Sequence, residues 1–217
     1  SDLTPTITGT ATVGAGETLT VVVSGATYTV TPAGGGAWSL DLGTATPTSG
    51  SLTALADGNT YNVTATVTDT AGNATSDSTS SELVIDTTAP GAPSVVSIST
   101  DTGVTDGVTS DNTLTFTGTA EANSTVEVFI DGSSIGTVPA DGSGDWTYDH
   151  TGTILADATY AVTATSTDAA GNTSSASSAF DVTVDTTAPG APTVVTQTTS
   201  DLTPTITGTA TVGAGET

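Results

Sequence analysis

The ten residues TYNVTATVTD, at positions 60–69, occur again in nearly the same form at 159–168 as TYAVTATSTD. In both copies apolar and polar residues alternate with a period of two, which is typical of a β-strand with one buried face. Tyr61, Val63, Ala65 and Val67 share one face, so we expect them to face a core, whereas the intervening Asn and Thr residues face solvent.

Six further segments of this kind, separated by turn residues, surround the second copy. We predict strands A to G at 94–99, 113–120, 125–131, 133–138, 145–150, 159–168 and 179–185. Residues 1–86 fit the same template without a strand A. Strands of this number and spacing predict an all-β fold of tandem seven-stranded immunoglobulin-like Greek-key β-sandwiches.

Two exact repeats define the domain organisation. DTTAPGAP occurs at 86–93 and again at 185–192, and residues 200–217 are identical to residues 1–18. Repeats at this distance indicate domains of roughly 100 residues. We predict a domain lacking strand A at 1–86, a linker at 87–93, a complete domain at 94–185, a linker at 186–192 and strands A and B of a third repeat at 193–217.

Aromatic residues support the sandwich interpretation. Tyr61 and Tyr160 stand at the start of strand F, after LADGN and LADA, where a tyrosine corner would bond its hydroxyl to nearby backbone. Trp38 and Trp146 lie on strand E, and we expect both to fill the core between the sheets.

The charge balance restricts the partners. The chain has 23 acidic residues and no Lys or Arg, for a formal net charge of −23, and it has no cysteine. Nucleic acids and anionic membranes are therefore poor partners, because both require basic residues. Disulfides are excluded, and clustered carboxylates must be either diluted by water or neutralised by cations from solution. Ca²⁺, a hard cation that prefers oxygen ligands, is the natural candidate.

The strings DTTAPGAP, TGTAEANSTVEVFIDG (117–132) and LADGNTYNVTATVTDTAGN (55–73), together with the strand E tryptophans, resemble the bacterial Ig-like repeats of giant adhesins. These adhesins are type I-secreted, biofilm-associated or RTX-type surface proteins, and the resemblance covers essentially the whole chain. It implies an extracellular stalk of many domains, rigidified by Ca²⁺ at the junctions, that supports cell adhesion or biofilm formation.

The topology of a sandwich independently predicts a metal site at each junction. The EF loop of one domain, the linker, and the BC and FG loops of the next domain meet at the same place. Oxygen ligands from these segments are Asp57, Asp86, Glu121, Asp168 and Asn172. Four carboxylates and an amide suit Ca²⁺, which takes 6–8 oxygens.

Three further groups are candidate Ca²⁺ ligands. They are Asp157 and Asp185 at the second junction, Asp69 and Asn73 in the FG loop of the first domain, and Asp101, Asp106 and Asp111 in the AB loop. The alternative interpretation is that each Asp only bonds backbone within a turn. The spacing in the AB loop does not match an EF-hand.

An enzyme is not expected, because the single histidine, His150, stands at a core position of its strand, Cys and Lys are absent, and no base recurs with the serines. A stalk segment is the favoured function. One alternative is a module that binds glycan or ice through Thr-rich strand faces such as Thr64, Thr66 and Thr68. Another is a strand-complemented extracellular fibre, in which residues 193–217 contact another copy head to tail. Otherwise, the expected partners are neighbouring repeats of the same chain.

Overall fold

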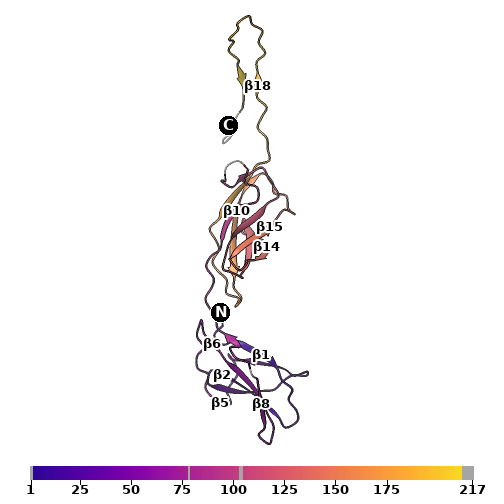
Figure 1. Cartoon of the computed structure of the whole chain (residues 1–217), viewed down its shortest axis with the longest axis vertical. Coiled ribbons are helices and arrows are strands. Elements are labelled where there is room, and N and C mark those ends of the chain that lie inside the picture. Colours follow the sequence, from indigo (N-terminus) through magenta and orange to yellow (C-terminus); the bar gives the residue numbers. More distant parts are fainter. Residues whose placement is uncertain (1, 78, 103–104, 212–217) are drawn as a thin grey trace.

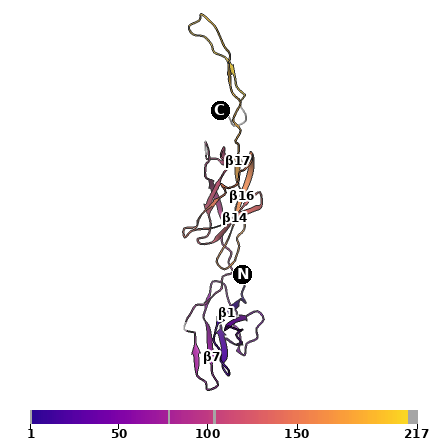
Figure 2. The ribbon, with the colours of Figure 1, turned by 90° about the vertical axis from the view of Figure 1, so that its right-hand side faces the viewer.

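The computed structural model describes residues 2–77, 79–102 and 105–211. All regular structure in these residues is β, arranged as two sandwiches that follow one another along the long axis, with a thin hairpin beyond the second (Figure 1). The elongated arrangement is equally clear in the perpendicular view (Figure 2). The predicted all-β class is therefore confirmed. No helix in the described residues is long and apolar enough to cross a membrane.

The second unit, β10–β17, is the complete sandwich. Its strands are β10 (Ser94–Ile98), β11 (Val108–Thr109), β12 (Thr115–Thr119), β13 (Thr125–Ile130), β14 (Ser133–Pro139), β15 (Asp145–Asp149), β16 (Ala158–Thr167) and β17 (Phe180–Val184). One sheet has the order β10-β12-β15, and the other has the order β11-β17-β16-β13-β14. Each of the seven predicted strands has a counterpart here. The fourth, β14, pairs with β13, so it belongs to the five-stranded sheet.

Strand β11 is an eighth strand within the segment predicted as the AB loop, and it pairs in parallel with β17. Gly107 makes this approach possible. It has a φ of +83°, and a Cβ at this position would lie 2.6 Å from the carbonyl oxygen of Asp181. The pairing depends on a glycine that fits close to a distant backbone, so the period-two pattern does not show it.

The first unit, β1–β9, follows the same plan without a counterpart of β10 in the described residues. Its strands are β1 (Thr6–Thr10), β2 (Thr18–Val23), β3 (Ala26–Val30), β4 (Ala37–Asp41), β5 (Ser49–Gly50), β6 (Thr60–Tyr61), β7 (Val63–Thr68), β8 (Ala74–Ser76) and β9 (Leu83–Val84). Its sheets have the orders β1-β4, β5-β3-β2-β7-β8 and β6-β9. The predicted strand F is interrupted at Asn62. There the Asn62 side chain accepts from Ser81 N at 2.9 Å, and the Glu82 carboxylate accepts from Val63 N at 2.9 Å.

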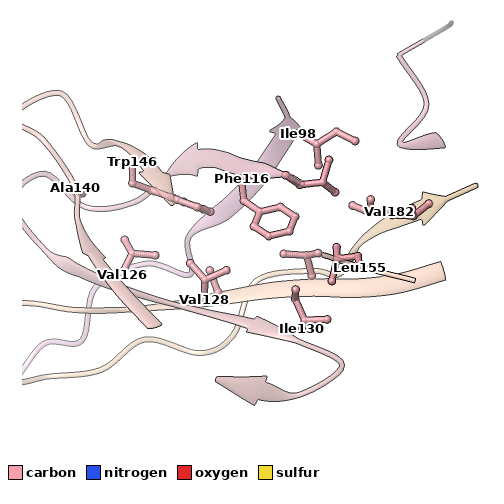
Figure 3. Packing of buried hydrophobic residues seen from close by; sticks show 13 residues of the cluster. Ile98, Phe116, Val126, Val128, Ile130, Ala140, Trp146, Leu155 and Val182 are labelled. Carbon is pink, nitrogen blue, oxygen red and sulfur yellow. The ribbon is translucent and has the colours of Figure 1, made fainter. Parts of the chain in front are cut away.

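Each sandwich has its own apolar core. In the second unit Trp146, Phe116 and Val128 lie in one interior between the sheets (Figure 3). Trp38 is the corresponding buried tryptophan of the first unit. Both predicted tyrosine corners are present. The Tyr61 hydroxyl accepts from Ala56 N at 2.8 Å, and the Tyr160 hydroxyl donates to Ala156 O at 3.0 Å.

The chain continues as a hairpin formed by β18 (Thr193–Val194) and β19 (Gly208–Thr209). These are the predicted strands A and B of the third repeat, although the regular pairing covers only two residues of each. Residues 212–217 of this predicted repeat lie outside the described residues.

Close packing around Gly118 provides a test of the fold. A Cβ at Gly118 would lie 1.9 Å from Ser94 O and 2.4 Å from the Trp146 ring. We expect Gly118→Ala to lower the free energy of unfolding of the second unit by about 1–3 kcal/mol, a usual cost of overpacking. Urea unfolding followed by tryptophan fluorescence, in a Trp38→Phe background that leaves only Trp146, measures this.

Gly142→Ala is the matched control, because nothing lies within 4 Å of a Cβ at that turn position. Equal unfolding curves for the Gly118→Ala and Gly142→Ala variants would contradict the packing described.

Candidate functional site

The loop between β5 and β6 is bonded to the first linker through Asp57. Its Oδ1 accepts from Thr87 N at 2.5 Å, and its Oδ2 accepts from the Thr88 hydroxyl at 2.6 Å. Thr88 N also donates to Asp86 Oδ1 at 3.0 Å. The Asp57 carboxylate therefore fixes the start of DTTAPGAP against the first unit, and the Asp86 carboxylate closes a turn within the linker. This set of bonds is called the linker latch below.

The second linker repeats this latch. Asp157 accepts from Thr186 N at 3.0 Å, and it also accepts from the hydroxyls of Thr186 and Thr187 at 2.7 and 2.8 Å. Thr187 N donates to Asp185 Oδ1 at 3.0 Å. The same local sequence thus makes equivalent contacts at both linkers, with one additional hydroxyl bond, from Thr186, at the second.

These bonds favour the ionised carboxylates. The hydroxyl of Thr88, followed by the backbone N–H of Thr87, lowers the pKa of Asp57 below its usual value. The hydroxyl and backbone N–H of Thr186 do the same for the pKa of Asp157. Neutral donors therefore stabilise the charges in a chain that has no Lys or Arg.

The second unit holds the other side of the first linker. Asn172 donates from Nδ2 to the carbonyl oxygen of Asp86 at 3.1 Å, and the Ser166 hydroxyl donates to the carbonyl oxygen of Gly91 at 3.3 Å. Pro90 and Pro93, which lie in this segment, are buried. The first linker therefore contacts structured groups on both sides along its length.

Asn172 has a second role within its own loop. Its backbone N–H and Nδ2 both donate to the carboxylate of Asp168 at 2.8 Å, and the side-chain bond is the main cause of the lowered pKa of Asp168. Its Oδ1 is buried without a hydrogen-bond partner, and the residue is only 6% exposed. A buried amide oxygen without a donor is a position that a cation or a water can fill.

The first unit contains the same loop, and no linker lies over it in the described residues. Asn73 donates to Asp69 from its backbone N–H and Nδ2 at 2.9 and 2.8 Å, as Asn172 does to Asp168. Asn73, however, is exposed. The local sequence TDxAGN (x is Thr70 or Ala169) thus forms the loop in both units, and the burial of Asn172 accompanies its contact with the linker.

The other predicted ligands are engaged in turns. In the segment before β12, Asp101 accepts from Gly107 N, Asp106 from Val108 N, and Asp111 from both the N–H and the hydroxyl of Thr113. Asp101 Oδ1 is a second buried oxygen without a partner. Glu121 contributes its backbone carbonyl to a turn closed by Ser124, and its side chain is exposed.

The structure thus brings the Asp86 backbone, Asp168 and Asn172 together, and separately joins Asp57 to the linker. It does not gather the predicted carboxylates into one cluster. Within 2–77, 79–102 and 105–211, no three His, Cys, Asp or Glu side chains form a group that could hold a metal ion. Whether Ca²⁺ binds at the junction stays a prediction.

Three hydroxyl residues of the junction, Thr87, Thr88 and Ser166, were not predicted from the sequence. The threonines had a detectable signal, because both recur in the exact repeat DTTAPGAP. The tripeptide LAD, which ends in Asp57 or Asp157, recurs about 30 residues before each copy. Ser166 had a weaker one: it replaces an apolar residue, Val67, on the buried face of the repeated strand.

Two sandwiches of this topology, joined through a fixed linker, define a tandem immunoglobulin-like β-sandwich protein. The model of the bacterial Ig-like domain matches residues 1–87 and 89–186, so the chain belongs to the bacterial Ig-like domain family. No curated protein matches the chain significantly.

Solved structures with similar folds include domains of bacterial surface proteins. A 1.5-MDa bacterial ice-binding adhesin, studied for its retention at the host cell surface, is 27% identical, with a TM-score of 0.34 and coverage of 88% of this chain and 60% of that one. A biofilm-associated protein BSP domain is 20% identical, with a TM-score of 0.34 and coverage of 85% and 28%. The fibronectin(III)-like modules of Clostridium thermocellum CbhA are 13% identical, with a TM-score of 0.42 and coverage of 83% and 85%.

Removing the Asp57 carboxylate should free the linker. Asp57→Ala deletes bonds between segments about 30 residues apart, whereas Asp149→Ala deletes only bonds to Thr151, two positions later. With spin labels on one cysteine introduced into each unit, we expect a broader distribution of distances in Asp57→Ala and an unchanged one in Asp149→Ala. Equal distributions in all three proteins would show that the latch does not hold the linker.

The latch should also weaken in acid. The pKa of Asp57 is lower in the folded chain than its unfolded value of about 3.9, so its contribution to stability is present above that value. That contribution is lost as the pH falls through the folded pKa. The stability difference between the wild type and Asp57→Ala should therefore be constant near neutral pH and should shrink below about pH 4. A stability difference between the two proteins that grows as the pH falls would contradict this prediction.

Proposed function

We propose that this chain is a segment of the extended stalk of a large bacterial cell-surface adhesin, outside the cell. Family membership and the tandem arrangement of the units support this proposal. The observation that carries it is the first linker, which is bonded on one side to Asp57 and on the other to Asn172 and Ser166. A linker fixed in this way holds consecutive domains at a set angle, as a spacer requires.

The surface chemistry favours a spacer over a binding module. Hydroxyl side chains on neighbouring strands pair with one another, as in Ser94 with Thr119 at 2.8 Å and Ser97 with Thr117 at 2.7 Å. Thr66 pairs with Ser76 in the same way at 2.8 Å. Such pairs stabilise a sheet by about 0.2–1 kcal/mol each and use threonine rows for cross-strand bonding. This use gives Thr66 of the row Thr64, Thr66 and Thr68 a structural role that needs no glycan or ice ligand.

We further propose that Ca²⁺ stiffens the junction. The buried amide oxygen Asn172 Oδ1 lacks a donor, and the Asp168 carboxylate and the Asp86 backbone lie beside the same side chain. Carboxylate, amide and carbonyl oxygens are the ligands that Ca²⁺ prefers, and water would complete the 6–8 positions. A bound cation would offset the negative charge where two acidic units meet.

The segment before β12 is a second proposed Ca²⁺ position. The other buried side-chain oxygen without a partner in the described residues belongs to Asp101. Asp106 and Asp111, also predicted ligands, lie in the same segment. The two buried oxygens without a partner, Asn172 Oδ1 and Asp101 Oδ1, thus both belong to residues that were predicted from the sequence to be cation ligands.

Calcium should raise the melting temperature of the wild-type chain, and EDTA should reverse the change. At free Ca²⁺ about 100 times the Kd, a site present only in the folded state stabilises by about 2.7 kcal/mol. In Asn172→Ala we expect the calcium-dependent shift to decrease by the contribution of the junction, while any contribution from the segment before β12 remains. Calorimetry with and without Ca²⁺, together with small-angle scattering, measures the stability and the stiffness of the rod.

Asn73→Ala is the matched control, because it alters the same loop at a position that is exposed in the described residues. It should keep the calcium response of the junction. Identical melting and scattering in Ca²⁺ and in EDTA would refute the calcium proposal. The stalk proposal would not be affected, because the spin-label experiment on the linker latch tests it separately.

A further inference from the structure

Strand β11 connects the two segments of the second unit that lead to its linkers. The first linker continues into β10 and then, through residues 99–107, into β11, whereas β17 leads directly into the second linker. In the described residues β10 pairs only with β12, in the other sheet, and β11 pairs only with β17. The pairing of β11 with β17 therefore joins the two ends of this domain through backbone bonds.

The parallel direction of this pairing determines how it responds to tension. The two linkers leave the second unit at opposite ends of its long axis (Figure 1). Tension between them pulls β11 backward along its own direction, toward the first linker, and pulls β17 forward, toward the second. Because the strands are parallel, these movements slide one strand past the other. The bonds between the strands must then break together, and not one after another as in a hairpin that is opened from its end.

Two backbone hydrogen bonds hold the pair. Thr183 N donates to Gly107 O at 2.8 Å, and Asp185 N donates to Thr109 O at 2.9 Å. The first bond requires glycine at 107, because a Cβ there would lie 2.6 Å from the carbonyl oxygen of Asp181. The second bond is made by the first residue of DTTAPGAP, so it lies where the second linker leaves the sandwich.

Further bonds tie β11 to the segment that follows β10. Thr109 is only 1% exposed, and its hydroxyl donates to Thr100 O and accepts from Asp111 N. Gly107 N donates to the Asp101 carboxylate at 3.0 Å. Tension that reaches the end of β10 is therefore passed to β11 through short bonded contacts.

The sequence also contains a repeat in which this connection is shorter. Residues 193–200, TVVTQTTS, correspond to 94–100 followed directly by Ser110, so residues 101–109 have no counterpart there. In the second unit β10 and β11 belong to different sheets, and packed sheets lie about 10 Å apart. Most of the residues that make this crossing are absent from the shorter connection. The two repeat types thus differ in the segment that supplies β11.

We propose that the β11–β17 pairing is a clamp that resists tension on the second unit, and that residues 101–109 make this repeat type more resistant to force than the type that lacks them. Tension reaches the clamp once β10 gives way, and the pairing of β10 with β12 is already interrupted by a register shift between Val95 and Ser97. The use of the clamp in the organism rests on the proposed stalk function, in which tension acts between successive linkers.

Single-molecule force spectroscopy on the 217-residue chain, in EDTA throughout, tests the clamp without involving Ca²⁺. The chain has no cysteine, so Ala89→Cys and Ala188→Cys, at equivalent exposed positions of the two linkers, allow force to be applied across the second unit alone. Gly107→Ala should lower the unfolding force. At a constant force it should raise the unfolding rate roughly tenfold, because it weakens hydrogen bonds that break together.

Two variants separate the clamp from other effects of the substitution. Gly132→Ala is the matched control, because Gly132 also has a positive φ, +76°, but nothing lies within 4 Å of a Cβ there. It should keep the wild-type unfolding force. Val128→Ala removes buried methyl groups from β13 and lowers stability away from the clamp. Relative to the stability lost in urea, the unfolding force should fall more in Gly107→Ala than in Val128→Ala.

Deletion of residues 101–109 gives the second unit the shorter connection of the other repeat type. It should lower the unfolding force at least as far as Gly107→Ala does. Wild-type forces in both the Gly107→Ala and the deletion variants would overturn the proposal. A fall in Gly107→Ala that only matches its loss of stability, as in Val128→Ala, would also overturn it. Neither result would bear on the stalk proposal, which the spin-label experiment on the linker latch tests separately.

Discussion

The absence of Lys and Arg is the constraint on which the rest of this structure depends. Every carboxylate must be stabilised by neutral N–H and O–H donors or by ions from solution. Asp41, Asp111 and Asp149 each accept from a nearby threonine or from a backbone N–H two residues on. The abundance of threonine next to aspartate follows from this need, since one residue supplies both a backbone and a hydroxyl donor.

At the linkers the same chemistry connects segments instead of closing turns. Asp57 reaches residues about 30 positions later in the chain, and Asp157 makes the equivalent bonds at the second linker. In the turns, these N–H and O–H donors stabilise a carboxylate close to them in the sequence. At the linkers, the same kinds of donor position the chain between the two sandwiches. Solvation of the charges and interdomain geometry are thus served by the same bonds.

Sequence periodicity predicted the strands well where one face of a sheet is buried, as in β13 and β16. It missed β11, because this short parallel pairing depends on Gly107 meeting the distant backbone of Asp181. Topology correctly indicated that the linker meets the loops containing Asp57 and Asn172. It did not predict which atoms meet, because the linker bonds to Asn172 through the backbone carbonyl of Asp86. Side-chain type alone does not determine that choice.

The first linker and strand β10 are parts of one continuous segment. DTTAPGAP at 86–93 leads directly into β10, whose Val95 and Ile98 pack in the core of the second unit. Displacement of the linker would therefore pull on a strand that completes a sheet, and a well-seated strand would in turn restrain the linker. If the chain acts as the proposed spacer, this continuity makes the stiffness of the junction and the stability of the following domain mutually dependent.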